Sequence, residues 1–130
     1  MEQTPLKRPP VKDNLITTLN RMGYMLAKPD TFNQAFIDFA TIVEAPVLEI
    51  GCAYGVATIP ALQNGATVIA NDPDERHLQL LKSQVPASSL KRLQLKPGRI
   101  PDDLDFAEES LGAVVSLILF ILQSWKNAFI

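Results

Sequence analysis

The chain has 130 residues and 47% of them are apolar, which suits one globular domain with a single hydrophobic core and does not favour a second. Its formal net charge of -2 provides no general field to attract nucleic acid or an anionic membrane. One cysteine, Cys52, excludes an internal disulfide, and with a single histidine, His77, the chain lacks the usual ligands of a structural zinc site.

Residues 1–13 contain three prolines and several charges, a composition that is typical of a flexible N-terminal arm. A secretory signal would have an apolar core there, so we expect a cytoplasmic protein. The longest apolar stretch, residues 111–122, is interrupted by Gly112 and Ser116 and falls short of the ~20 residues that a membrane helix needs. It is therefore interpreted as a buried strand.

Two amphipathic helices are predicted before the first strand. In residues 14–26, apolar side chains recur at three- and four-residue spacing, which predicts a helix. In residues 28–43 the signal is stronger, because Asp30 or Thr31 can cap a helix there. The apolar stripe of this second helix, which we expect to face the core, consists of Phe32, Ala35, Phe36, Phe39 and Ile42 or Val43.

Strand and helix patterns alternate after these two helices. Strands are predicted at residues 47–50, 67–71, 90–95 and 113–121, and helices at residues 56–64 and 73–85. Asp72 and Pro73 are interpreted as the cap and the first residue of the helix over 73–85. The order predicts a Rossmann-like α/β fold, a parallel sheet with right-handed crossovers and flanking helices, in one domain over residues 14–130.

Small residues alternate directly after the first predicted strand, in the sequence VLEIGCAYG at residues 47–55. Ligands of open parallel sheets bind beyond the carboxyl ends of the strands, where the strand order reverses. Gly51, Ala53 and Gly55 would allow a tight turn at such a point and would let a ligand approach main-chain N–H groups. The loop is therefore a candidate binding loop.

Asp72 is the second candidate, because it closes the next strand 21 residues after Gly51. An acid about 20 residues past such a loop is placed to accept hydrogen bonds from ribose hydroxyls. A dinucleotide fingerprint would need a glycine where the chain has Val56. Glu49, near the end of the first strand, would repel a phosphate and could pair with a cationic group. The pattern favours an adenosine-type cofactor without a pyrophosphate.

The run Glu49-x-Gly51-x-Ala53-x-Gly55, followed by VIANDPDERHLQLL, resembles the first two cofactor motifs of the class I S-adenosylmethionine-dependent methyltransferases, over roughly residues 30–120. The resemblance implies S-adenosyl-L-methionine as the cofactor and direct displacement of its methyl group onto an acceptor. It also implies a seven-stranded fold, of which this chain supplies about four strands. By the same resemblance, Glu49 would orient the loop and the amino group of the cofactor, and Asp72 would bind the ribose diol.

The resemblance assigns ten residues to the cofactor: Glu49, Gly51, Cys52, Ala53, Gly55, Asn71, Asp72, Pro73, Arg99 and Ile100. Residues 51–55 would line the methionine moiety, and Pro73 would lie beside the adenine. Many members of the family place an acid behind a glycine after the third strand, whereas this chain reads Gly98-Arg99-Ile100-Pro101. Backbone groups there and the Ile100 side chain are then expected to contact the adenine. No catalytic residue and no metal ligand are assigned.

The chain stops at QSWKNAFI, directly after the last predicted strand, which predicts a truncated or frameshifted domain. A strand at or near the sheet edge would expose unpaired backbone groups and apolar surface. A homodimer through that edge, a C-terminal segment that folds back, and poor solubility are the three outcomes we consider.

Several alternatives stay open at this point. A glycine-rich turn can be purely structural, and helix capping explains Asp72 as well as ribose binding does. His77 is interpreted as a solvated helix residue, while Tyr24 and Tyr54 either close over a cofactor or simply pack.

A NAD-dependent oxidoreductase and a cofactor-binding module without turnover are the competing functions. The acceptor is expected to be a small molecule, because no basic groove is evident and the end of the last strand lacks the motif of enzymes that methylate amino groups of nucleic acids.

Overall fold

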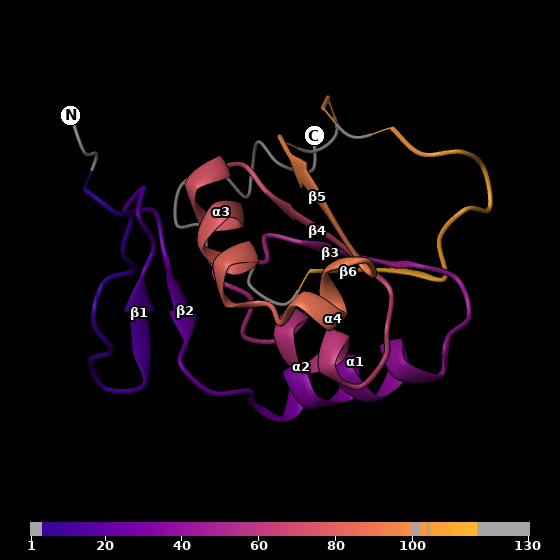
Figure 1. Ribbon diagram of the computed structural model, residues 1–130, viewed down its shortest axis with the longest axis horizontal. Helices are drawn as coiled ribbons and strands as arrows, with labels where there is room; N and C mark the ends of the chain where they lie inside the picture. Colours follow the sequence, from indigo (N-terminus) through magenta and orange to yellow (C-terminus); the bar gives the residue numbers. More distant parts are fainter. Residues whose placement is uncertain (1–3, 100–101, 104, 117–130) are drawn as a thin grey trace.

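The computed structural model describes residues 4–99, 102–103 and 105–116. Its central element is a parallel sheet of four strands: β3 (Val47–Ile50), β4 (Val68–Asp72), β5 (Leu93–Pro97) and β6 (Ala113–Ser116). The strands lie in the order β5-β4-β3-β6 (Figure 1). The predicted Rossmann-like parallel sheet is therefore confirmed.

The two inner strands, β3 and β4, carry the continuous apolar runs that a strand covered on both faces needs. All five residues of β4 are buried, and so are the first three of β3. The chain adds β4 and β5 on one side of β3 and then places β6 on the other side. The strand order therefore reverses between β3 and β6, and the loop after β3 leaves the sheet at that point.

Four helices are present among the described residues: α1 (Thr31–Ile42), α2 (Thr58–Gln63), α3 (Glu75–Gln84) and the single turn α4 (Ala87–Leu90). The helices α1 and α2 lie against each other (Figure 1). Ile37 of α1 and Leu62 of α2 join the same core cluster as Val47 and Val68 of the sheet. No helix in the described part of the chain has the length and apolar character to cross a membrane.

The structure does not contain the helix predicted over residues 14–26. These residues form an antiparallel hairpin in which β1 (Leu15–Thr17) pairs with β2 (Tyr24–Leu26). Ile16 lies opposite Met25, and both side chains are buried while the residues before them are exposed. The helical prediction is wrong because two short strands happen to place apolar residues at intervals that also fit a helix.

The turn of the hairpin explains why a strand pair forms. Thr18 donates its N–H to the carbonyl of Gly23 at 3.0 Å, and its hydroxyl donates to the side chain of Asn20 at 2.7 Å. Arg21 adopts a φ of 58°, a left-handed conformation that a helix interior does not contain. Residues 4–11 before the hairpin form no helix or strand, and Lys12 pairs with Leu15.

The helix α1 begins at its predicted cap, where the Asp30 side chain accepts a hydrogen bond from the N–H of Asn33 at 2.8 Å. Its predicted core stripe is largely wrong: Phe32 is 76% exposed, Ile42 is 78% exposed, and Ala35 and Phe39 are exposed as well. The buried residues are Asn33, Phe36, Ile37 and Ala40. Both stripes have helical spacing, and the helix turns the one that contains the small Ala40 toward the core.

Three predicted boundaries also shift. Asp74, not Asp72, caps α3, because its side chain accepts a hydrogen bond from the N–H of Arg76 at 3.0 Å. Asp72 is the last residue of β4, and Pro73 lies in the turn before the helix.

The third strand of the predicted sheet begins at Leu93 rather than Leu90, because residues 87–90 form α4. The predicted fourth strand is confirmed over Ala113–Ser116, at one edge of the described sheet, and the rest of it lies outside the described residues.

Candidate functional site

The loop that follows β3 has an unusual backbone. Gly51, Ala53 and Gly55 adopt φ values of 70°, 47° and 90°, so every second residue is left-handed. Glycine adopts such angles without penalty, whereas a left-handed alanine costs roughly 1–2 kcal/mol. Ala53 stands where the resembling motif has its middle glycine, and it adopts a backbone conformation that favours glycine.

The carboxylate of Asp72 meets this loop directly. Its Oδ2 accepts a hydrogen bond from the N–H of Ala53 at 3.0 Å. One residue earlier on each segment, the N–H of Cys52 donates to the carbonyl of Asn71 at 2.9 Å. The small-residue loop and the acid therefore lie at the same edge of the sheet, as the spacing in the sequence predicted. Their contact with a cofactor remains a prediction.

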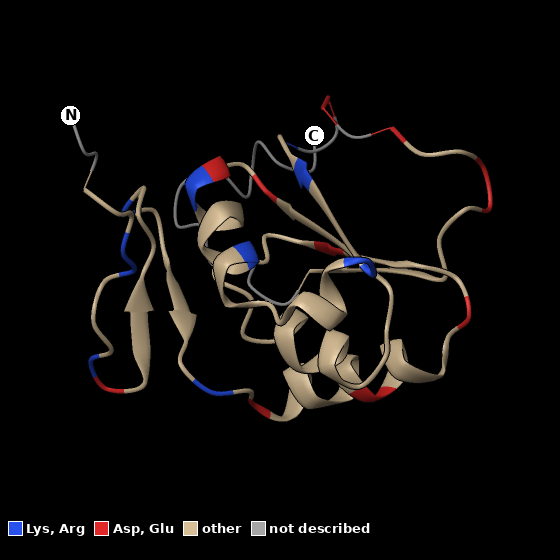
Figure 2. Cartoon of the chain, viewed as in Figure 1, with Lys and Arg blue, Asp and Glu red and all other residues tan. Residues whose placement is uncertain are grey.

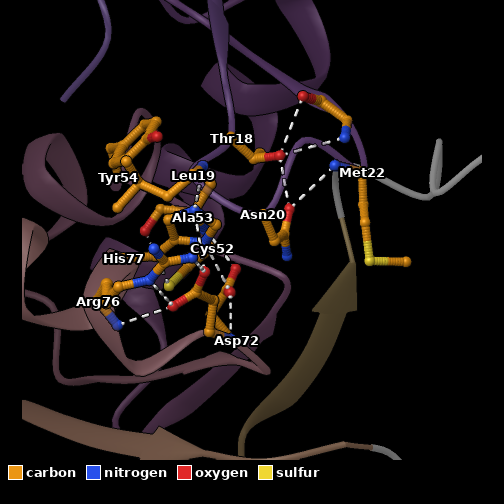
Figure 3. A network of polar contacts seen from close by, with 12 residues as sticks. Thr18, Leu19, Asn20, Met22, Cys52, Ala53, Tyr54, Asp72, Arg76 and His77 are labelled. Carbon is orange, nitrogen blue, oxygen red and sulfur yellow. Dashed lines mark hydrogen bonds and ion pairs between the residues drawn. The ribbon is translucent and has the colours of Figure 1, made fainter.

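The other oxygen of Asp72 is held from α3. Its Oδ1 accepts from the N–H of Asp74 at 2.9 Å and from Nδ1 of His77 at 2.9 Å. His77 is only 1% exposed, so its interpretation as a solvated helix residue is wrong. The imidazole occupies the space between Asp72 and the hairpin (Figure 3).

The hairpin packs against the loop and α3. The hydroxyl of Tyr54 donates to the carbonyl of Thr17 at 2.8 Å, and the N–H of Leu19 donates to Nε2 of His77 at 2.8 Å. The rings of Tyr54 and His77 meet edge to face, with centroids 5.0 Å apart. Burial raises the pKa of Tyr54 to about 12, so its hydroxyl keeps its proton and donates. Tyr54 therefore packs under the hairpin, and Tyr24 is exposed.

Glu49 is buried in β3, where its carboxylate accepts a hydrogen bond from the hydroxyl of Thr58 at the start of α2. Burial raises its pKa to about 7, the Thr58 hydrogen bond opposes this rise, and the nearby charge of Asp72 adds to it. Burial likewise raises the pKa of the Cys52 thiol, which is 1% exposed. Cys52 is thus an unreactive small residue of the loop rather than a nucleophile.

The remaining predicted residues have different positions. Asn71 is buried, and its amide donates to the carbonyls of Lys96 and Gly98 at 2.8 and 3.1 Å, so its side chain holds the end of β5. Pro73 is exposed. Arg99 is also exposed, and its N–H donates to Asp103 at 2.9 Å. Ile100 lies outside the described residues.

The donor and acceptor groups of this site suit one kind of ligand. Two carboxylates, Glu49 and Asp72, lie near the carboxyl ends of adjacent strands, and they would repel a phosphate. Hydroxyl groups can donate to a carboxylate, and a positive charge would be stabilised beside one. The residues present therefore fit a ligand with a ribose and a cationic group.

The distribution of charged residues distinguishes the loop from the rest of the described chain. The Lys and Arg positions are spread over several separate segments of the described chain (Figure 2). Within the two inner strands the charged residues are the carboxylates Glu49 and Asp72. Asp72 provides a negative charge beside the loop, and Glu49 adds to it as the pH rises through its raised pKa of about 7.

Sequence reasoning missed the two residues that connect this site to the hairpin, His77 and Leu19. His77 follows the strand-ending acid by five positions, which places it in the first turn of α3. A histidine so few residues after a strand-ending acid indicates that its imidazole can contact that carboxylate. Leu19 acts through its backbone N–H, and no side-chain pattern identifies such a contact.

Comparison with known proteins gives a consistent result. A family model described as a methyltransferase domain matches residues 47–129, which is more than half of the chain. The crystal structure of the glycopeptide N-methyltransferase MtfA is 28% identical with a TM-score of 0.53, over 68% of this chain and 42% of that one. No curated protein sequence gives a match.

Two further structures show the same fold at lower identity. MtfA complexed with S-adenosyl-L-methionine superposes with a TM-score of 0.56 at 24% identity, over 82% of this chain and 45% of that one. A putative S-adenosyl-L-methionine-dependent methyltransferase from Methanococcus maripaludis gives a TM-score of 0.53 at 16% identity, over 65% and 39% of the two chains. The chain spans less than half of the length of each of these structures.

Proposed function

The chain belongs to the methyltransferase-domain family, and from this membership we propose that it binds S-adenosyl-L-methionine and supports methyl transfer to a small-molecule acceptor. The observation that carries the proposal is the 3.0 Å hydrogen bond between the N–H of Ala53 and Oδ2 of Asp72. It joins the two motifs of the class I methyltransferases, which lie far apart in the sequence, at one edge of the sheet. The complex of MtfA with S-adenosyl-L-methionine supports the choice of cofactor.

The proposed roles follow from the positions of the residues. Asp72, whose carboxylate has three protein donors, would accept a hydrogen bond from a ribose hydroxyl with its remaining acceptor capacity. Gly51 is half-buried and has no side chain, so it would leave space for the methionine moiety. Glu49 braces the loop through Thr58 and would interact favourably with a positively charged ligand.

The chemistry places few demands on proton transfer by the protein. When bound, S-adenosyl-L-methionine would supply an activated methyl group on a sulfonium, which passes to the acceptor with S-adenosylhomocysteine as the leaving group. The contribution of this chain is then to orient the donor, which supplies a large part of the rate in such a reaction. Asp72 and the loop hold one end of the ligand, and the described residues offer no group that must act as an acid or base on the donor side.

The charge distribution of the chain bears on the class of acceptor. The Lys and Arg positions are spread over several separate segments of the described part of the chain (Figure 2), and the formal net charge of -2 does not favour nucleic acid. MtfA is a glycopeptide N-methyltransferase, and that specificity belongs to MtfA. A small metabolite is the acceptor we propose.

A second candidate function is cofactor binding without turnover. It is favoured by one observation: the cofactor motifs lie wholly within residues 47–72, and no residue of the chain is assigned to the acceptor. Both functions require the same binding site, and they differ only in whether an acceptor can be held beside it.

Calorimetric titration of the purified chain with S-adenosylhomocysteine tests the cofactor proposal. We expect saturable binding to one site per chain and a rise in the midpoint of thermal unfolding, since a ligand that binds the folded state stabilises it. NADH is the matched control and should give neither effect. Absence of any heat or thermal shift with folded protein refutes the proposal, and binding without transfer to any acceptor tested favours the second candidate.

A further inference from the structure

His77 holds a position that the cofactor motifs do not explain. It is the only histidine of the chain and is 1% exposed. Its Nδ1 lies 2.9 Å from Oδ1 of Asp72, and its Nε2 lies 2.8 Å from the N–H nitrogen of Leu19 (Figure 3). Both ring nitrogens therefore have partners, one in the candidate site and one in the hairpin.

These two contacts determine the tautomer of the ring. The peptide N–H of Leu19 can only donate, so Nε2 of His77 must be the accepting nitrogen. A neutral imidazole then carries its proton on Nδ1, where it donates to the carboxylate of Asp72. The edge-to-face contact with Tyr54 and the burial of the ring leave it little freedom to rotate.

The same contacts fix the carboxylate. Asp72 accepts hydrogen bonds from Ala53 on one oxygen and from Asp74 and His77 on the other. A carboxylate has about four acceptor positions, so three are occupied by the protein and the direction of the fourth is set by them. Of the three donors, only that of His77 belongs to a side chain, so it alone can be changed by substitution without altering the backbone.

We propose that His77 is a positioning residue: it orients the Asp72 carboxylate for the ribose hydroxyls of the cofactor and is itself held in the required tautomer by the hairpin at residues 15–26. The inference rests on the proposed function, because it assigns Asp72 to the ribose. The charged groups around the ring, Asp72, Asp74 and Arg76, form a connected set in which Arg76 pairs with Asp74 at 2.7 Å. Asp74 is thereby occupied, and Asp72 is the carboxylate that the ring orients.

The first test uses the wild-type chain without an affinity tag of histidines. With one histidine in the sequence, its imidazole resonances in a nitrogen-15 correlation spectrum are assigned without ambiguity. We expect a single tautomer with the proton on Nδ1 and slow exchange of the Leu19 amide. Addition of S-adenosylhomocysteine should shift the imidazole resonances. A proton on Nε2, or the averaged signal of a solvated imidazole, overturns the inference.

The second test compares two substitutions that each keep one half of the contact. His77→Asn retains a donor near the position of Nδ1 and loses the acceptor for Leu19, whereas His77→Gln retains an acceptor near Nε2 and loses the donor to Asp72. We expect His77→Asn to bind S-adenosylhomocysteine within about threefold of wild type, and His77→Gln to bind at least about tenfold more weakly, as loss of a hydrogen bond to a charged group implies. Faster exchange of the Leu19 amide should appear in His77→Asn alone.

The outcomes are separable. Equal affinity of both variants and wild type overturns the positioning role while the proposed function stands. Failure of the wild type itself to bind refutes the proposed function and this inference with it. Circular dichroism establishes that each variant is folded, and if neither variant folds, the tautomer observed in the wild-type chain decides.

Discussion

The backbone of Ala53 and the carboxylate of Asp72 are joined by a 3.0 Å hydrogen bond across the ends of two parallel strands. Ala53 is in a left-handed conformation with a φ of 47°, and its N–H donates to an acceptor that is 5% exposed. A charged acceptor of this kind offsets the strain of the loop, since hydrogen bonds to ionised groups are roughly twice as strong as neutral ones. Asp72 thus has a structural role in addition to the one proposed for the ribose.

Replacement of Asp72 by asparagine should therefore destabilise the chain as well as weaken cofactor binding. An amide has one accepting oxygen, and three donors converge on the carboxylate, so one donor of the protein would face the new NH2 group. We expect a loss of about 3 kcal/mol in the free energy of unfolding, measured by urea denaturation. Asp38→Asn, on the exposed side of α1, is the control and should change it by less than about 0.5 kcal/mol. Equal stabilities of the two variants would contradict the account.

Gly55 and Gly65 form a matched pair for the cost of crowding in the loop. Both have a positive φ, 90° and 96°. A Cβ at Gly55 would lie 2.3 Å from Cδ1 of Leu81, whereas no atom of the described residues lies within 4 Å of one at Gly65. Gly65→Ala should cost only the backbone strain, about 1 kcal/mol. Gly55→Ala should cost about 1–3 kcal/mol more because Leu81 must move. Thermal or urea unfolding measures the difference, and equal losses would show that the loop is not packed as described.

Glu49 should make stability depend on pH. Its pKa is raised in the folded chain from the ordinary 4.5 to about 7 because it is buried. Below the lower value the carboxyl is protonated in both states, and no penalty arises. As the pH rises, the unfolded chain ionises first, so stability is lost progressively up to the folded pKa. The loss amounts to about 3 kcal/mol over this window.

The check is the substitution Glu49→Gln, which cannot ionise and still accepts from Thr58. Urea unfolding at about pH 5 and about pH 8 should show that the variant loses less stability than wild type as the pH rises. Glu44→Gln, at an exposed position, serves as the control and should keep the wild-type dependence. Parallel pH profiles for wild type and Glu49→Gln would rule out a buried, protonated Glu49.

Tyr54 attaches the hairpin to the loop through its hydroxyl. Tyr54→Phe removes the hydrogen bond to Thr17 and leaves that carbonyl without its side-chain donor. We expect a loss of about 1 kcal/mol in the free energy of unfolding and faster amide exchange within residues 15–26. Tyr24→Phe is the control, since Tyr24 is 54% exposed, and it should leave both quantities unchanged. Unaltered exchange in Tyr54→Phe would mean that apolar packing alone holds the hairpin.

The parts of the fold that the sequence predicted well are those in which several signals agree. The strands at residues 47–50 and 67–71 have continuous apolar runs with a turn signal on either side, and both are inner strands of the sheet. The sequence offers Asp30 or Thr31 as the cap of α1, and the structure has Asp30 in that role. The convergence of Ala53 and Asp72 followed from a rule about strand ends rather than from local propensity.

The failures occur where one periodicity fits two structures. Apolar residues at three- and four-residue intervals in residues 14–26 suggested a helix, but Ile16 and Met25 face one side of a hairpin. In α1, the predicted stripe through Phe32 and Phe36 and the buried stripe through Phe36 and Ala40 both have helical spacing, and only tertiary packing chooses between them. The interpretation of His77 as solvated fails for a different reason. A polar residue early in a helix is usually exposed, and only its five-residue distance from Asp72 indicates that the two side chains can meet.

The central claim is that the loop over residues 51–55 and Asp72 form one cofactor site, and amide chemical-shift mapping tests it most directly. A nitrogen-15-labelled chain is titrated with S-adenosylhomocysteine, and the backbone resonances of the described residues are followed. The account predicts that the shifts concentrate at Gly51, Ala53, Gly55 and Asp72, while Gly65 at the far end of α2 is unaffected. Shifts confined to α1 or to the hairpin strands, with the loop resonances unchanged, would contradict it.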